Sequence, residues 1–148
     1  MNIMERSKIL FGIIFLFFLL GCSIPTDFYI QNLSQTKKTV KINYNRKISK
    51  LLKDSLYDSF SFNYENNIVE PRFFHVNKNL KHLEKISIDS CSISLEIEPH
   101  STVRIEKTHN YWWTHMIGCI EIDGQPYDIQ ELRKNSEEVK HDYIYKIK

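Results

Sequence analysis

Short runs of alternating apolar and polar residues recur from residue 27 to the C-terminus, and this period of two is the feature that most constrains the fold. Alternation puts the apolar side chains on one face of a β-strand, whereas a helix repeats about every 3.6 residues. Turn residues separate the runs at intervals of about 8–12 residues. A chain with about six to eight such strands is predicted to form an antiparallel β-sandwich or a small barrel.

Two of these runs, 27–33 and 39–45, flank the segment SQTKK and predict a hairpin. The dipeptide Asp123-Gly124 favours a tight turn between two further strands. Residues 47–57 instead carry apolar side chains at helical spacing, which predicts one short peripheral helix. The remaining runs that predict strands are 60–64, 86–98, 103–106, 116–130 and 142–148.

A different pattern opens the chain, where twelve uncharged residues, 9–20, follow Arg6 and Lys8. A helix that spans a bilayer needs about 20 apolar residues. The apolar part of a secretory signal is shorter, about 7–15 residues, and follows a positively charged start. The length of the run and the charges before it therefore predict an export signal.

The apolar run ends in Leu19-Leu20-Gly21-Cys22, which resembles the lipobox of bacterial lipoproteins at every position. The resemblance implies that a diacylglyceryl group is attached to the sulfur of Cys22. It also implies that the signal is cut between Gly21 and Cys22 and that the new amino group is acylated. Each buried methylene contributes about 0.8 kcal/mol, so two or three acyl chains make a stable membrane anchor.

This resemblance divides the chain into a signal peptide at 1–21, a lipidated cysteine with a short tether at 22–26, and a single β-rich domain at 27–148. It implies an outer-membrane location facing the periplasm, because Ser23 rather than aspartate follows the cysteine. The bilayer is then an expected partner, and no cofactor is expected besides the covalent lipid on Cys22.

The charge balance and the motifs argue against several functional classes. The chain has 20 Lys and Arg against 18 Asp and Glu without a basic stripe, so a nucleic-acid partner is not expected. It contains no Gly-x-Ser-x-Gly turn, no Gly-rich phosphate loop and no His-Glu-x-x-His helix. We therefore expect no catalytic residues and a protein that is not an enzyme.

Cys91 and Cys119 are the cysteines of the predicted domain. Disulfides persist in exported proteins, and a bridge between these two would stabilise the fold by about 3–4 kcal/mol. However, Cys91 is in phase with the apolar residue Ile93, whereas Cys119 is out of phase with Ile120. The sequence leaves open whether the two thiols are bridged.

The segment THNYWWTH gathers the aromatic residues Tyr111, Trp112 and Trp113 between His109 and His115. Flat aromatic rings provide large contact areas at small entropic cost, which suits a platform for a sugar or a peptide. The alternative is that one tryptophan packs under the edge of the sandwich while the other lies at the surface or at the lipid headgroups. The spacing of the two histidines matches no known ligand pattern, so no metal site is predicted.

Together these features predict a cell-envelope lipoprotein with a non-catalytic binding or assembly role. In the assembly case, an edge of the sandwich would add a strand to the sheet of an envelope protein partner. The alternative is a sugar or peptide ligand bound by residues 111–113. An envelope enzyme is the least favoured of the three.

Overall fold

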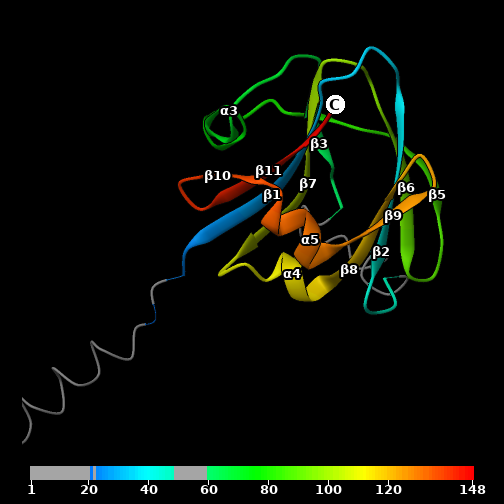
Figure 1. Cartoon of the computed structure of the whole chain (residues 1–148). Helices are drawn as coiled ribbons and strands as arrows, with labels where there is room; N and C mark the ends of the chain where they lie inside the picture. The colour runs from blue at the N-terminus through cyan, green and yellow to red at the C-terminus, as the bar shows by residue number, and fades with distance from the viewer. Residues whose placement is uncertain (1–20, 22, 49–59) are drawn as a thin grey trace, which may run out of the picture.

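The computed structural model describes residue 21, residues 23–48 and residues 60–148, and these form two facing β-sheets with three short helices (Figure 1). Sheet A contains, in spatial order, β10 (Glu137–Val139), β11 (Asp142–Ile147), β1 (Pro25–Asn32), β7 (Ser101–His109), β3 (Asn63–Glu65) and β4 (Lys81–His82). Sheet B contains β5 (Lys85–Ile88), β6 (Ser92–Ile97), β2 (Lys38–Tyr44), β8 (Ile117–Ile122) and β9 (Gln125–Asp128). The prediction of a mainly β, sandwich-like fold is confirmed.

The main core lies between the inner faces of the two sheets, as alternation requires. Sheet A contributes Phe28 and Ile30, and sheet B contributes Val40 and Ile42. Two of the helices, α4 (Trp113–Met116) and α5 (Ile129–Lys134), add buried side chains to the same cluster. Both helices lie at one end of the sandwich (Figure 1).

Strand β1 is buried on its outer face as well, where a second, smaller cluster covers sheet A. Tyr29 of β1 and Ile144 of β11 pack there against Phe74 of helix α3 (Pro71–Val76). The Gln31 side chain donates a hydrogen bond to the carbonyl oxygen of Val69 at 2.9 Å, which holds the segment before α3 on the sheet. This covering explains why both faces of β1 are excluded from solvent.

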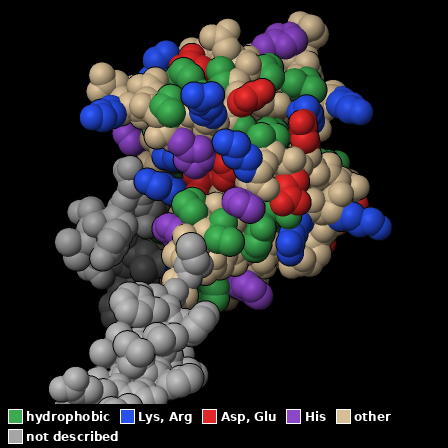
Figure 2. All heavy atoms as spheres, turned by 90° about the vertical axis from the view of Figure 1, so that its left-hand side faces the viewer, with side chains coloured by type: hydrophobic (Ala, Val, Ile, Leu, Met, Phe, Trp, Pro, Cys, Tyr) green, Lys and Arg blue, Asp and Glu red, His purple; other side chains and the backbone are tan. Residues whose placement is uncertain are grey.

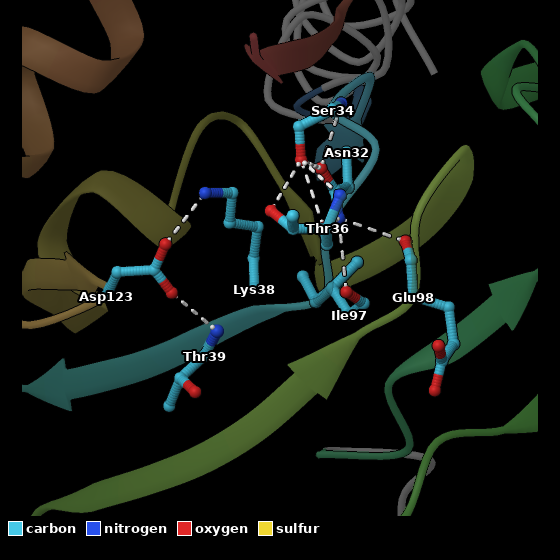
Figure 3. A network of polar contacts seen from close by, with 8 residues as sticks. All are labelled: Asn32, Ser34, Thr36, Lys38, Thr39, Ile97, Glu98 and Asp123. Carbon is cyan, nitrogen blue, oxygen red and sulfur yellow. Dashed lines mark hydrogen bonds and ion pairs between the residues drawn. The ribbon is translucent and has the colours of Figure 1, made fainter.

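The predicted hairpin of residues 27–45 is wrong, because its two strands belong to different sheets. β1 pairs antiparallel with β7 and parallel with β11, whereas β2 pairs with β6 and β8. The buried Asn32 side chain holds the connection between them by donating to the carbonyl oxygens of Thr36, Ile97 and Glu98 (Figure 3). The loop thereby carries the chain across from sheet A to the end of β6 in sheet B.

Other strand predictions succeed or fail according to local backbone geometry. Strands β8 and β9 are joined by Asp123-Gly124, both with positive φ, and β11 is the expected last strand. The long run 86–98 is instead folded into the pair β5 and β6. In the run 60–64, Phe60 and Phe62 have φ of 63° and 45°, so only its end forms a strand, β3.

Two predictions fall largely outside the described part of the chain. The first is the signal peptide with Cys22, and the second is the helix expected at 47–57. Strand β1 begins at Pro25, two residues before the predicted start of the β-rich domain. Among the described residues, no helix has the length and hydropathy needed to cross a membrane.

Candidate functional site

The three aromatic residues of the predicted binding segment do not share one face. Trp113 is fully buried and stacks on Phe28, with the ring centroids 4.5 Å apart. Tyr111 is half-buried and meets Tyr143 edge-on at 5.8 Å. Trp112 is 56% exposed and is therefore the ring most open to a ligand.

The turn after β7 separates the rings. Asn110 and Tyr111 both have positive φ, which reverses the chain before α4. The turn is held by Thr26, whose hydroxyl accepts a hydrogen bond from the backbone N–H of Tyr111 at 2.7 Å. Consequently Trp113 points into the sandwich while Trp112 remains outside.

Trp112 lines a surface groove of about 400 Å³ at the end of β7. Basic side chains contribute to its walls, and the buried carboxyl group of Glu106 belongs to the same groove. Such a site offers an aromatic face, cationic groups and one hydrogen-bonding carboxyl. Its lining includes Arg46, Glu106, Lys107, His109, Trp112 and Met116.

Glu106 faces inward because of an irregularity in the β1–β7 pairing between Phe28 and Tyr29. It pairs with Phe28, and the hydroxyl of Tyr44 donates a hydrogen bond to its carboxyl group at 3.3 Å. Burial raises the pKa of Glu106 to about 7, although the bonds from Tyr44 and from the backbone of Lys107 oppose this rise. The carboxyl group can therefore act as donor or acceptor near neutral pH.

The raised pKa of Glu106 predicts that stability depends on pH. Between the ordinary carboxyl pKa of 4.5 and about 7, the folded chain retains a proton that the unfolded chain has released. The contribution of Glu106 to the free energy of unfolding should therefore be greatest below pH 4.5 and fall by about 3 kcal/mol as pH rises through 7. We expect Glu106→Gln to lack this contribution, so it should gain stability relative to the wild type as pH rises.

Urea unfolding of both proteins from pH 4 to pH 8 measures this difference. Comparing the two proteins cancels the titration of shared groups that do not interact with Glu106. Parallel pH profiles for wild type and Glu106→Gln would show that Glu106 titrates normally in the folded chain.

Cys91 and Cys119 are free thiols, so the disulfide that the sequence left open is not formed. Cys119 pairs with Asn43 on one side of β2, while the backbone N–H of Tyr44 donates to the carbonyl oxygen of Cys91 on the other side. Strands two positions apart in a sheet are separated by about 10 Å. A disulfide needs Cα atoms within about 7 Å, so β2 keeps the thiols apart.

We predict that both thiols react without prior reduction. A maleimide added to the denatured chain should modify Cys91 and Cys119, as located by peptide mass, and added reductant should not increase the modification. Cys91→Ser should lose one modified site and leave the other unchanged. Labelling that appears only after reduction would contradict the free thiols.

A second polar site lies on the outer face of sheet A, beside α3. Asp27, His75 and Asp142 each offer a ligand-type atom, and these atoms lie within 4.8 Å of one another. Burial raises the pKa of Asp27, with Arg104 opposing the rise and Asp142 adding to it. Sequence analysis missed this site, because its members are far apart along the chain and follow no known ligand spacing.

Comparisons with protein-family models, with curated proteins and with solved structures found no significant match to this chain.

Proposed function

We propose that the protein is a cell-envelope lipoprotein, anchored in the membrane through acylated Cys22, with a non-catalytic role in assembly. The lipobox residues Leu19-Leu20-Gly21-Cys22 support the anchor. Ser23 supports an outer-membrane location facing the periplasm, as the resemblance implies. The fold is consistent with this proposal, since β1 begins only three residues after Cys22.

The short connection predicts how the domain is held. Ile24 and Asn110 exchange two hydrogen bonds, one through the Asn110 side chain at 3.0 Å and one through its backbone N–H at 2.8 Å. Cys22 is two residues from Ile24, which covalent geometry limits to about 7 Å. Since Asn110 also lines the groove with Trp112, this end of the sandwich would lie next to the bilayer.

The observation that carries the assembly role is the edge strand β5. Among the described strands, β5 pairs only with β6, and its residues Ile86 and Ile88 are 55% and 52% exposed. Edge strands present unpaired N–H and C=O groups, and natural proteins usually protect them with charged residues. A pair of exposed isoleucines on such a strand favours a partner that adds a strand to sheet B.

Intact mass of the membrane-extracted protein tests the anchor. The expected species is residues 22–148 plus the mass of the acyl chains. An unmodified full-length mass would overturn both the lipobox assignment and the location.

Photocrosslinking in cells tests the assembly role. A photoreactive residue in place of Ile86 should give one discrete crosslinked product, and Ile88→Lys should remove that product without releasing the protein from the membrane. The same residue at Asn79, which is exposed after α3, is the matched control. Equal products at both positions, or none at Ile86, would argue against partner binding at β5.

The groove beside Trp112 supports a second candidate, a sugar- or peptide-binding lipoprotein. Trp112 offers an exposed ring, and Glu106 and Arg46 offer polar groups in the same groove. In that case Trp112→Ala should abolish ligand binding while the fold remains intact.

A further inference from the structure

The outer face of sheet A carries a buried polar centre that neither the membrane anchor nor the β5 edge explains. Figure 2 shows acidic, basic and histidine side chains close together on the side of the molecule that includes this face. Three side chains converge at this centre from distant parts of the chain: Asp27 from β1, His75 from α3 and Asp142 from β11. The segment that carries His75 is held on the sheet by a hydrogen bond between the Val69 backbone N–H and the Thr102 hydroxyl at 3.1 Å.

Each aspartate uses one carboxylate oxygen for support from the protein. Oδ2 of Asp27 accepts from the Tyr29 hydroxyl at 3.2 Å and lies 3.5 Å from the Arg104 guanidinium. Arg104 is held in turn by a hydrogen bond to the side chain of Asn63. In the same way, Oδ1 of Asp142 accepts from the backbone N–H of Asp27 at 2.7 Å.

The second oxygens of the two aspartates differ in their partners. Oδ2 of Asp142 is hydrogen-bonded to Nε2 of His75 at 2.8 Å. Oδ1 of Asp27 has no hydrogen-bond partner among the described residues, although the Asp27 side chain is only 1% exposed. An unpaired buried carboxylate oxygen is costly, because its lost hydration is not replaced.

We propose that Asp27, His75 and Asp142 form a binding site for a divalent transition-metal cation such as Zn²⁺. A cation there would pair with the free oxygen of Asp27 and with Oδ2 of Asp142, and it would take Nε2 of neutral His75 as its nitrogen ligand. Two carboxylates and one imidazole are a ligand set that Zn²⁺ accepts, and the imidazole disfavours Mg²⁺ and Ca²⁺. Three protein ligands leave a tetrahedral cation one position for water.

The geometry requires only small adjustment. With metal–ligand bonds of about 2.1 Å, the ligand atoms of a tetrahedral zinc site lie about 3.4 Å apart. The present atoms lie within 4.8 Å of one another, and the His75 side chain, 38% exposed, would exchange its 2.8 Å hydrogen bond to Asp142 for the cation. The supporting bonds from Tyr29, Arg104 and the Asp27 backbone correspond to the outer shell that orients ligands in metal sites.

The charge balance also favours a cation. Asp27 and Asp142 bring two negative charges, and Arg104 is the cationic group in contact with Asp27. Arg104 also lies 5.8 Å from the centroid of the Phe74 ring, so the two carboxylates share this one guanidinium in a partly apolar environment. The exposed edge of His75 provides the path by which a cation would enter from solvent.

Metal binding by the full chain tests the proposal directly. The protein, purified in detergent without a histidine tag and stripped with a chelator, is equilibrated with Zn²⁺ and then freed of unbound metal. We expect about one Zn²⁺ per chain, with Mg²⁺ and Ca²⁺ failing to compete. His75→Gln should weaken Zn²⁺ binding by at least the 10–100-fold or so that loss of an outer-shell partner causes.

Matched controls separate this site from adventitious binding. His100→Gln and His115→Gln remove exposed histidines that lie outside this cluster and should retain Zn²⁺. Because His75 is exposed, His75→Gln should fold, and its unchanged circular dichroism should confirm this. Co²⁺ in place of Zn²⁺ should give a visible absorption spectrum that His75→Gln loses. Failure to retain Zn²⁺, or retention that His75→Gln does not weaken, would overturn the proposal.

Discussion

Replacing Cys22 with alanine is expected to leave a full-length, non-acylated precursor. The thiol is the nucleophile that forms the thioether, and the lipobox resemblance places cleavage immediately before the modified cysteine. Without acyl chains, the precursor lacks their contribution to membrane binding of about 0.8 kcal/mol per buried methylene. The measurement is the intact mass of Cys22→Ala beside the wild type, together with the distribution of each between membrane and soluble fractions.

Cys91→Ala and Cys119→Ala are the matched controls for this experiment. Both positions lie in the sandwich and take no part in the proposed anchor, so both variants should be cleaved and acylated like the wild type. If Cys22→Ala is still cut and carries acyl chains, Cys22 is not the site of lipid attachment.

Trp113→Ala should be the most destabilising substitution in the aromatic segment. The indole is fully buried, stacks on Phe28 and lies 5.5 Å from Tyr143, so its removal opens a cavity at the end of the core. Loss of a buried tryptophan costs about 3–5 kcal/mol. Urea unfolding followed by far-ultraviolet circular dichroism measures the change without relying on tryptophan fluorescence.

Two further variants identify the cause of that loss. Trp112→Ala removes an exposed ring and should change the free energy of unfolding by no more than about 0.5 kcal/mol. Trp113→Phe keeps an aromatic ring and removes the indole N–H, which has no hydrogen-bond partner among the described residues, so it should cost less than Trp113→Ala. Equal losses for Trp112→Ala and Trp113→Ala would contradict the different burial of the two rings.

Predictions from sequence were correct where a few neighbouring residues are enough to determine the local structure. The Asp123-Gly124 turn depends on two residues that tolerate positive φ between alternating strands, so local sequence is sufficient to find it. The prediction of one strand over residues 86–98 was wrong. The alternation continues on both sides of the turn between β5 and β6, so the sequence pattern does not reveal that turn.

These sequence patterns do not determine which strands pair with each other. Residues 27–33 and 39–45 have alternation suited to neighbouring strands, yet β1 joins sheet A and β2 joins sheet B. Asn32 contributes to this outcome through hydrogen bonds to carbonyl groups about 65 residues away along the chain, at Ile97 and Glu98. Contacts at such separation depend on the packing of the whole domain.

The sequence by itself determined the β character of the domain and supplied the resemblance to a lipobox on which the proposed anchor rests, because both are properties of neighbouring residues. Only the tertiary structure decided that Cys91 and Cys119 stay apart, that Trp113 is buried while Trp112 is exposed, and that Asp27, His75 and Asp142 meet. The physical reason is the same in each case. Side chains far apart in sequence are brought together or separated by sheet order, which results from packing over the entire core.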